Sequence, residues 1–245
     1  MGTIVAVANL KGGTGKTTVA VNVASALARR HDVVLVDADP QQAAAAWTHG
    51  AAPGLRARRH LMGSDGPGNG GGDADAAIYR RWLEAVRKAA ATTDYLVIDL
   101  PPRLSGVVAA AFALADVVVV PVTPGGAEMR ATRRTAAMID RARRSRADGG
   151  PDCVLVPNRV DRRTSVGRSL DHALRELGEA VGPVLRQRAA HMSSFDTGAW
   201  VGAHAPESEA LDEVEALVKY LRSRLSQRPA SAASEAAESA AASSL

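Results

Sequence analysis

The sequence predicts an α/β fold, in which a doubly wound, mostly parallel sheet is flanked by helices. Short runs rich in Val and Ile alternate along the chain with longer segments of helical periodicity, and this alternation is typical of a parallel sheet covered on both faces. Only 3% of the residues are aromatic, so the core must consist of Val, Leu, Ile and Ala, as suits a sheet buried on both sides. A chain of 245 residues has the length of one domain with a sizeable core.

The runs of β-branched residues predict strands at 3–8, 33–37, 95–99, 117–121 and 153–157, and a short additional strand at 183–185. The helical patterns between them predict helices at 16–30, 40–48, 76–91, 104–114, 127–146, 164–177 and 207–225. Pro40 suits the first turn of the second helix, and the prolines at 101 and 102 end the third strand.

We expect residues 1–228 to form one domain. Residues 62–76 contain the segment GSDGPGNGGGD, whose composition favours a flexible, glycine-rich surface loop. Residues 229–245 are Ala, Ser and Glu apart from a first proline and a last leucine, so they lack the apolar side chains that a core requires and are expected to be a disordered tail.

Composition excludes several classes of protein. No stretch approaches the ~20 apolar residues of a membrane span, and the N-terminus lacks the pattern of a signal peptide, so we expect a cytoplasmic protein. Cys153 is the single cysteine, which rules out an internal disulfide and a multi-cysteine metal site within one chain.

The segment KGGTGKTT at positions 11–18 lies between an apolar run and a helical pattern. A glycine-rich turn at a helix start directs backbone N–H groups and the positive end of the helix dipole at one anion. We therefore predict a nucleotide-phosphate site made by Gly12, Gly13, Thr14, Gly15, Lys16, Thr17 and Thr18. Lys16 is expected to reach the β- and γ-phosphates, and the Thr17 hydroxyl to hold Mg²⁺.

The generic phosphate-loop pattern fails at one position, because Leu10 stands where its first glycine belongs, and Lys11 precedes the glycines instead. With this extra lysine the chain resembles the ParA/MinD group of deviant Walker A ATPases, and within it most of all the small plasmid-partition proteins of the ParA and ParF type. The resemblance covers residues 3–225 and implies ATP and Mg²⁺ as ligands. The nitrogenase iron protein shares the lysine-first loop but needs paired cysteines, which this chain lacks.

Three carboxylates stand at strand ends, where ligands bind in open α/β sheets. Asp37 and Asp39 belong to the segment DADPQ, and Asp99 precedes two prolines as in the family's Walker B motif. Asp39 is the candidate for orienting the attacking water. The resemblance supports that role and implies that Asp37 lies on the Mg²⁺ side and that Asp99 holds the ion, through water. In a structural alternative, Asp37 and Asp39 simply cap the following helix.

Two further residues take their expected roles from the resemblance. Asn158, in the segment NRVD, matches the region that contacts adenine, and its amide offers both a donor and an acceptor, although it also suits a turn. Lys11 is expected to cross to the nucleotide of a second subunit, in the manner of an arginine finger supplied in trans. ATP hydrolysis would thereby depend on a homodimer.

Basic residues suggest contact with nucleic acid. The net charge is +4, and because the tail holds Glu235 and Glu238 but no basic residue, residues 1–228 carry +6. Arg130, Arg133, Arg134 and Arg141 share one face of a predicted helix, which also suits a solvated surface. The resemblance favours the C-terminal part of the fold, and we predict that Arg186, Arg188, Lys219, Arg222 and Arg224 contact DNA phosphates. Such contacts are independent of sequence and sensitive to salt.

The leading expectation is a ParA-like partition ATPase on the nucleoid. It would dimerise with ATP, bind DNA non-specifically, and be released when an adaptor of the ParB or centromere-binding type stimulates its otherwise slow hydrolysis. One alternative is a MinD-like membrane-cycling ATPase, which needs an amphipathic C-terminal helix that the Ala/Ser tail does not supply. Another alternative is a P-loop metabolic enzyme of the dethiobiotin synthetase kind.

Overall fold

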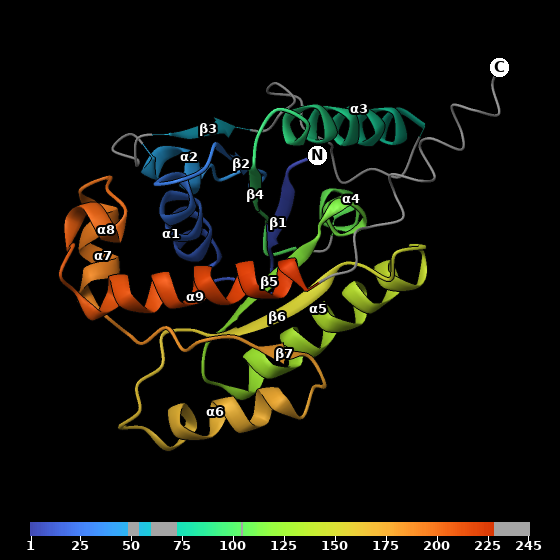
Figure 1. The fold of residues 1–245 in the computed structure, drawn as a ribbon. Coiled ribbons are helices and arrows are strands. Elements are labelled where there is room, and N and C mark those ends of the chain that lie inside the picture. The colour runs from blue at the N-terminus through green and yellow to red at the C-terminus, as the bar shows by residue number, and fades with distance from the viewer. Residues whose placement is uncertain (49–53, 60–72, 104, 228–245) are drawn as a thin grey trace.

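The computed structural model describes residues 1–48, 54–59, 73–103 and 105–227. The strands of its sheet are β1 (Thr3–Val7), β2 (Val33–Asp37), β3 (Leu55–Arg59), β4 (Tyr95–Asp99), β5 (Val117–Val122), β6 (Asp152–Pro157) and β7 (Ala180–Val181). They lie in the order β3-β2-β4-β1-β5-β6-β7, and every pairing between them is parallel (Figure 1). The predicted doubly wound α/β fold is confirmed.

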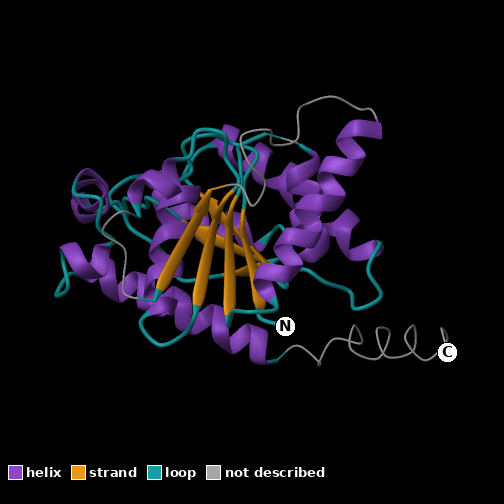
Figure 2. Ribbon diagram, turned by 90° about the horizontal axis from the view of Figure 1, so that it is seen from above, coloured by secondary structure: helices purple, strands orange, loops and turns teal. Residues whose placement is uncertain are grey.

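Helices cover both faces of the sheet, as Figure 2 shows. One face packs against α1 (Lys16–Ala28), α2 (Ala43–Trp47), α8 (Val201–His204) and α9 (Glu209–Ser226). The other packs against α3 (Asp73–Ala90), α4 (Gly106–Leu114), α5 (Gly126–Arg144) and α6 (Ser165–Arg175). The short helix α7 (Ala189–Asp196) lies against α8.

Alternation along each strand divides the core into two layers. Val5 and Val7 of β1 face the layer under α1 and α9, whereas Ile4 and Ala6 face the layer under α4. Because successive strand side chains point to opposite faces, a run of apolar residues fills both layers at once.

Several elements differ from the prediction. β3 was not predicted, because its sequence LRARR has no apolar run; within the described residues it pairs with β2 alone, at the edge of the sheet. α7 and α8 were also not predicted, and α2 begins at Ala43 rather than 40, because Gln42 takes the left-handed conformation with φ of 54°.

The strand expected at 183–185 was placed wrongly, since the ladder runs at Ala180–Val181. Pro183 has no N–H to donate and interrupts the pairing. The backbone nevertheless follows β6 beyond it, because the amide of Gly182 donates to the Leu155 carbonyl and the amide of Leu185 donates to that of Pro157, each at 2.8 Å.

Of the glycine-rich loop predicted at 62–76, residues 62–72 lie outside the described residues, and 73–76 belong to α3. The tail predicted at 229–245 also lies outside them. Among the helices of the described part, none is long and apolar enough to cross a membrane.

Candidate nucleotide-binding site

The glycine-rich loop joins the end of β1 to the start of α1 at the carboxyl edge of the sheet. Gly15 caps α1 in the left-handed conformation, with φ of 85°. A Cβ atom at this position would lie 2.3 Å from Nδ2 of Asn158, so no other residue fits. The loop therefore presents its backbone closely packed at a helix N-terminus, the arrangement expected for binding phosphate.

Lys16 is buried inside this loop, with 7% of its surface exposed. Its Nζ donates to the backbone carbonyl of Lys11 at 3.3 Å. Burial lowers the pKa of Lys16, and the nearby carboxylates of Asp99 and Asp39 act in the opposite direction. The predicted phosphate-binding lysine and two of the predicted carboxylates thus share one site.

Asp99 is 1% exposed at the end of β4. Its Oδ2 accepts a hydrogen bond from the Thr17 hydroxyl at 2.7 Å. Burial raises the pKa of Asp99 to about 7, against the opposing effect of the Thr17 hydrogen bond. Oδ1 of Asp99 is buried without a hydrogen-bond partner among the described residues. An unsatisfied carboxylate oxygen beside a threonine hydroxyl fits the oxygen ligands that Mg²⁺ takes in nucleotide sites.

Asp37 lies beside Asp99 on the neighbouring strand β2. Its Oδ1 accepts from the amide of Asp39 at 3.1 Å, and its Oδ2 accepts from the amide of Ala45 in α2 at 2.9 Å. For Asp37 these are the contacts of the capping alternative, and they fix the turn that carries Asp39. A role of Asp37 on the Mg²⁺ side stays a prediction.

Asn158 and Arg159 brace the loop from the end of β6. Nδ2 of Asn158 donates to the Thr14 carbonyl at 2.7 Å, and Nη1 of Arg159 donates to the Gly13 carbonyl at 3.1 Å. Asn158 is 5% exposed. The side-chain donor of Asn158 thus binds the protein itself, and the contact with adenine stays a prediction.

A cavity of about 540 Å³ adjoins these residues. Thr17, Thr18 and Asn158 line it on the side of the loop, and His191 and Phe195 of the unpredicted helix α7 line it on the other. A cavity beside a phosphate-binding loop offers room for the base and ribose of a nucleotide. Sequence reasoning missed the α7 residues, because nothing in their pattern marked a binding site.

Lys11 is partly exposed, and its ammonium has no hydrogen-bond or ion-pair partner within the described part of the chain. Its backbone, by contrast, is held in place. The buried Asn9 accepts from the Lys11 amide at 3.0 Å and donates to the Pro121 carbonyl at 2.9 Å, and the amide of Leu10 donates to Thr135 of α5 at 3.2 Å. Sequence reasoning missed Asn9 and Thr135; a polar residue directly after the apolar strand was the available signal.

The residues predicted to contact DNA do not form one surface. Arg188 pairs with Glu209 and with Glu213, the latter at 2.7 Å, and Arg224 makes two hydrogen bonds to Asp152, at 2.7 and 3.1 Å. These two guanidinium groups are already neutralised by carboxylates.

Arg186 lies near the same Glu213, 3.9 Å from it, and is 45% exposed. Lys219 and Arg222 are exposed on α9 and pair with no carboxylate among the residues that the structure describes. The structure therefore brings Lys219 and Arg222 together and separates them from the other three.

Comparison with known proteins agrees with this site. The model of the CobQ/CobB/MinD/ParA nucleotide-binding domain matches residues 5–199. The maintenance of carboxysome distribution protein A of Gloeobacter kilaueensis is 34% identical over 215 residues, covering 84% of this chain and 89% of that protein. The chromosome-partitioning ATPase Soj of Thermus thermophilus is 32% identical over 250 residues, covering 91% and 96%. The ATP complex of a variant McdA from Cyanothece has a TM-score of 0.75 at 15% identity, covering 90% and 96%, and shows likeness of fold.

The chain belongs to the CobQ/CobB/MinD/ParA nucleotide-binding family. Within this family it is a ParA/MinD-like ATPase, and the resemblance inferred from its lysine-first loop is confirmed.

Proposed function

We propose that this protein is a ParA-like partition ATPase. It forms an ATP-dependent sandwich dimer, binds DNA non-specifically, and is released when a partner stimulates hydrolysis. The observation that carries the proposal is the position of Lys11. Its backbone is fixed by Asn9 at the mouth of the loop, while its ammonium is unpaired in the described part of the chain and the site already holds a lysine, Lys16. A second cation beside a triphosphate, supplied by the facing subunit, suits the transfer of a phosphoryl group.

Each residue of the site has a distinct task in this proposal. Lys16 and the loop amides hold the phosphates, and Asp39 orients the water that attacks the γ-phosphorus in line, giving ADP and phosphate. Thr17 and Asp99 hold Mg²⁺, with Asp37 next to them. When bound, the ion neutralises charge that builds up on the phosphate oxygens. Lys11 of the partner completes the site, so hydrolysis is slow in the monomer.

The cargo is DNA or another large assembly. Relatives of this chain include proteins named for carboxysome distribution and for chromosome partitioning. An adaptor of the ParB or centromere-binding type marks the cargo and stimulates hydrolysis, and the ATPase acts in the cytoplasm on the nucleoid. The basic balance of the chain supports DNA over a membrane as the surface to which it binds.

Mixing two inactive variants tests the proposal. Lys11→Ala lacks the lysine donated to the partner, and Asp39→Ala lacks the residue that orients the water. A mixed dimer has one complete site, made of Asp39 from one subunit and Lys11 from the other. Random mixing makes half of the dimers mixed, and each mixed dimer has one active site of two. With DNA and ATP present, the mixture should therefore regain about a quarter of the wild-type rate of hydrolysis.

Each variant alone serves as a control, as does Lys88→Ala, which removes an exposed lysine from α3. If the mixture hydrolyses no faster than the two variants separately while mixed dimers are present by mass spectrometry, Lys11 does not act across the interface.

A further inference from the structure

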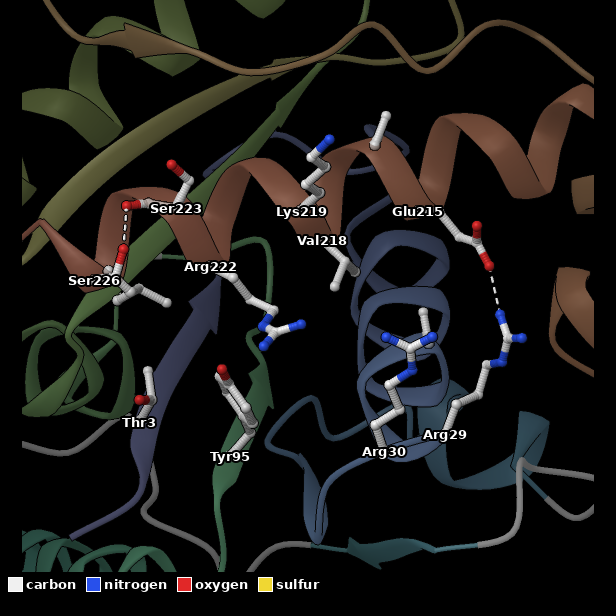
Figure 3. Close-up of a pocket in the computed structure, with 13 residues that line it drawn as sticks. Thr3, Arg29, Arg30, Tyr95, Glu215, Val218, Lys219, Arg222, Ser223 and Ser226 are labelled. Atoms are coloured by element: carbon white, nitrogen blue, oxygen red, sulfur yellow. Dashed lines mark hydrogen bonds and ion pairs between the residues drawn. The ribbon is translucent and has the colours of Figure 1, made fainter.

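A second cavity lies at the opposite edge of the sheet from the nucleotide site. It has a volume of about 880 Å³ and lies between the C-terminal end of α1 and the outer side of α9. Thr3 and Tyr95, which begin β1 and β4, form its floor. Figure 3 shows this groove, which we call the α1/α9 groove.

The groove carries an excess of positive charge. Four basic residues, Arg29, Arg30, Lys219 and Arg222, line it together with one carboxylate, Glu215. Arg29 pairs with Glu215. Arg30, Lys219 and Arg222 have no carboxylate partner among the described residues. The groove therefore holds three uncompensated cations.

Figure 3 shows how two of these side chains lie. Arg222 extends from α9 toward Tyr95, and Arg30 extends from the end of α1 on the other side of the same space. Guanidinium groups repel one another unless an anion lies near both. Their planar donors match the oxygens of phosphate. The hydroxyl groups of Tyr95 and Ser223 add further donors, whereas the Ser226 hydroxyl already donates to the Ser223 carbonyl at 2.8 Å.

We infer that the α1/α9 groove binds phosphate groups of the DNA backbone. The inference rests on the DNA binding in the proposed function and locates it. Arg30 joins the predicted Lys219 and Arg222, whereas Arg29, Arg188 and Arg224 serve the fold, because carboxylates already neutralise them. Apolar side chains such as Val218 and Leu225 also line the groove, but its uncompensated charged groups are cations with planar or ammonium donors, so contacts to phosphate are the ones it favours.

The position of the groove has a consequence for the nucleotide. Helix α1 begins at Lys16, in the phosphate-binding loop, and its C-cap is Arg29, in the groove. Nucleotide and DNA therefore bind at opposite ends of one helix and do not compete for space. Cations at the C-terminal end of a helix are also favoured by its dipole.

The test compares two double variants that remove equal charge. Arg30→Ala with Arg222→Ala removes two of the three uncompensated cations of the groove, and Arg133→Ala with Arg134→Ala removes two exposed arginines from α5. Binding of a fluorescent 24-base-pair duplex is measured by anisotropy with ATP and Mg²⁺ at several KCl concentrations. The groove variant should bind about ten-fold more weakly, and the α5 variant should lose less than about three-fold.

Equal losses in the two variants would mean general attraction to a basic surface and would overturn the inference. Unchanged binding in the groove variant would overturn it as well, while the proposed function would stand. If the wild-type protein binds no duplex, the proposed function itself fails. Two further probes are tested in the same way: vesicles of anionic lipid, and tripolyphosphate free in solution. If the groove variant loses binding to the vesicles or to tripolyphosphate but keeps its binding to DNA, the assignment to DNA is contradicted.

Discussion

At the scale of single residues, Asp99 combines a functional site with a cost in stability. Its carboxylate is 1% exposed, and burial raises its pKa to about 7 from 3.8. A carboxyl group whose pKa rises on folding lowers stability as the pH passes from about 4 to above 7, because ionisation is easier in the unfolded chain. In the proposed function, a bound Mg²⁺ uses the charge of this carboxylate.

Asp99→Asn should therefore stabilise the nucleotide-free protein at pH 8 by about 2 kcal/mol, or about 5 °C in Tm, while hydrolysis is lost. The amide keeps an oxygen for the Thr17 hydroxyl. Calorimetry at pH 8 and pH 5 measures the effect, and the gain should shrink at pH 5, where Asp99 of the folded protein is already protonated. A variant less stable at pH 8 than the wild type would contradict this account.

Substitution of Asp39 should affect hydrolysis and leave ATP binding intact. It is only partly buried, and its Oδ1 accepts from the Gln41 amide at 2.9 Å. Asp39→Ala should keep its affinity for ATP, lose hydrolysis by about 100-fold or more, and accumulate as a dimer. Light scattering with ATP measures the dimer, quantification of bound nucleotide measures the retained ATP, and phosphate release measures hydrolysis. A variant that stays monomeric and free of ATP would show that Asp39 does not act on the water.

The sequence identified those residues whose chemistry is local. The glycine-rich loop with Lys16 and Thr17 could be predicted, because a strand, a turn and a helix start stand next to one another in the chain. Asp99 lies 82 residues from Thr17, and its place beside the loop was expected from the family resemblance. Asn9 and Asn158 could not be placed in the same way. Their hydrogen bonds join positions 112 to 144 residues apart, and only the folded sheet brings such positions together.

At the scale of elements, prediction succeeded where apolar runs are continuous and failed where packing decides. The central strands β1, β4 and β5 are buried on both faces, so their Val and Ile content identified them. β3 has three arginines and is a strand because β2 offers it an open edge. α7 has no apolar stripe to mark it and forms where the chain passes the nucleotide site and packs against α8.

Hydrogen bonds connect helix α5 to the phosphate-binding loop. Thr135 of α5 accepts from the Leu10 amide, and Asn9 binds both the Lys11 amide and β5. Asn9→Ala should destabilise the protein by about 1–3 kcal/mol, because buried backbone groups lose a partner. The substitution should also lower the ATPase activity measured in the presence of DNA about ten-fold, because the backbone of Lys11 is no longer fixed.

Asn22→Ala is the matched control. Asn22 is buried in α1 and also binds two backbone groups, donating to the Thr18 carbonyl at 2.8 Å and accepting from the Val201 amide at 2.9 Å, but neither bond is to the backbone of Leu10 or Lys11. Activity is compared at a temperature well below both melting transitions. Equal losses of activity would show that stability alone, and not the position of Lys11, is responsible.

At the scale of the whole molecule, the candidate nucleotide site and the proposed DNA-binding groove lie at opposite edges of one sheet. The nucleotide site lies where β1, β2 and β4 end, and the α1/α9 groove lies where β1 and β4 begin. A sandwich dimer that closes over its nucleotides would bring the first edges together and leave both grooves open. Such a dimer has two DNA-binding grooves where the monomer has one, and linked sites bind more tightly than either alone.

This arrangement predicts a difference in salt dependence between the two states. The logarithm of DNA affinity falls with the logarithm of salt concentration by about 0.9 for each phosphate neutralised. With ATP, the Asp39→Ala dimer should therefore show about twice the slope of the nucleotide-free monomer on a duplex long enough to reach both grooves. Adding Arg222→Ala removes one contact per groove and should reduce the dimer slope by about 2 and the monomer slope by about 1. Titrations between 50 and 300 mM KCl measure these slopes. Equal slopes in the two states would show that the dimer engages DNA through a single groove, because a second groove in contact with the duplex must release its own counterions.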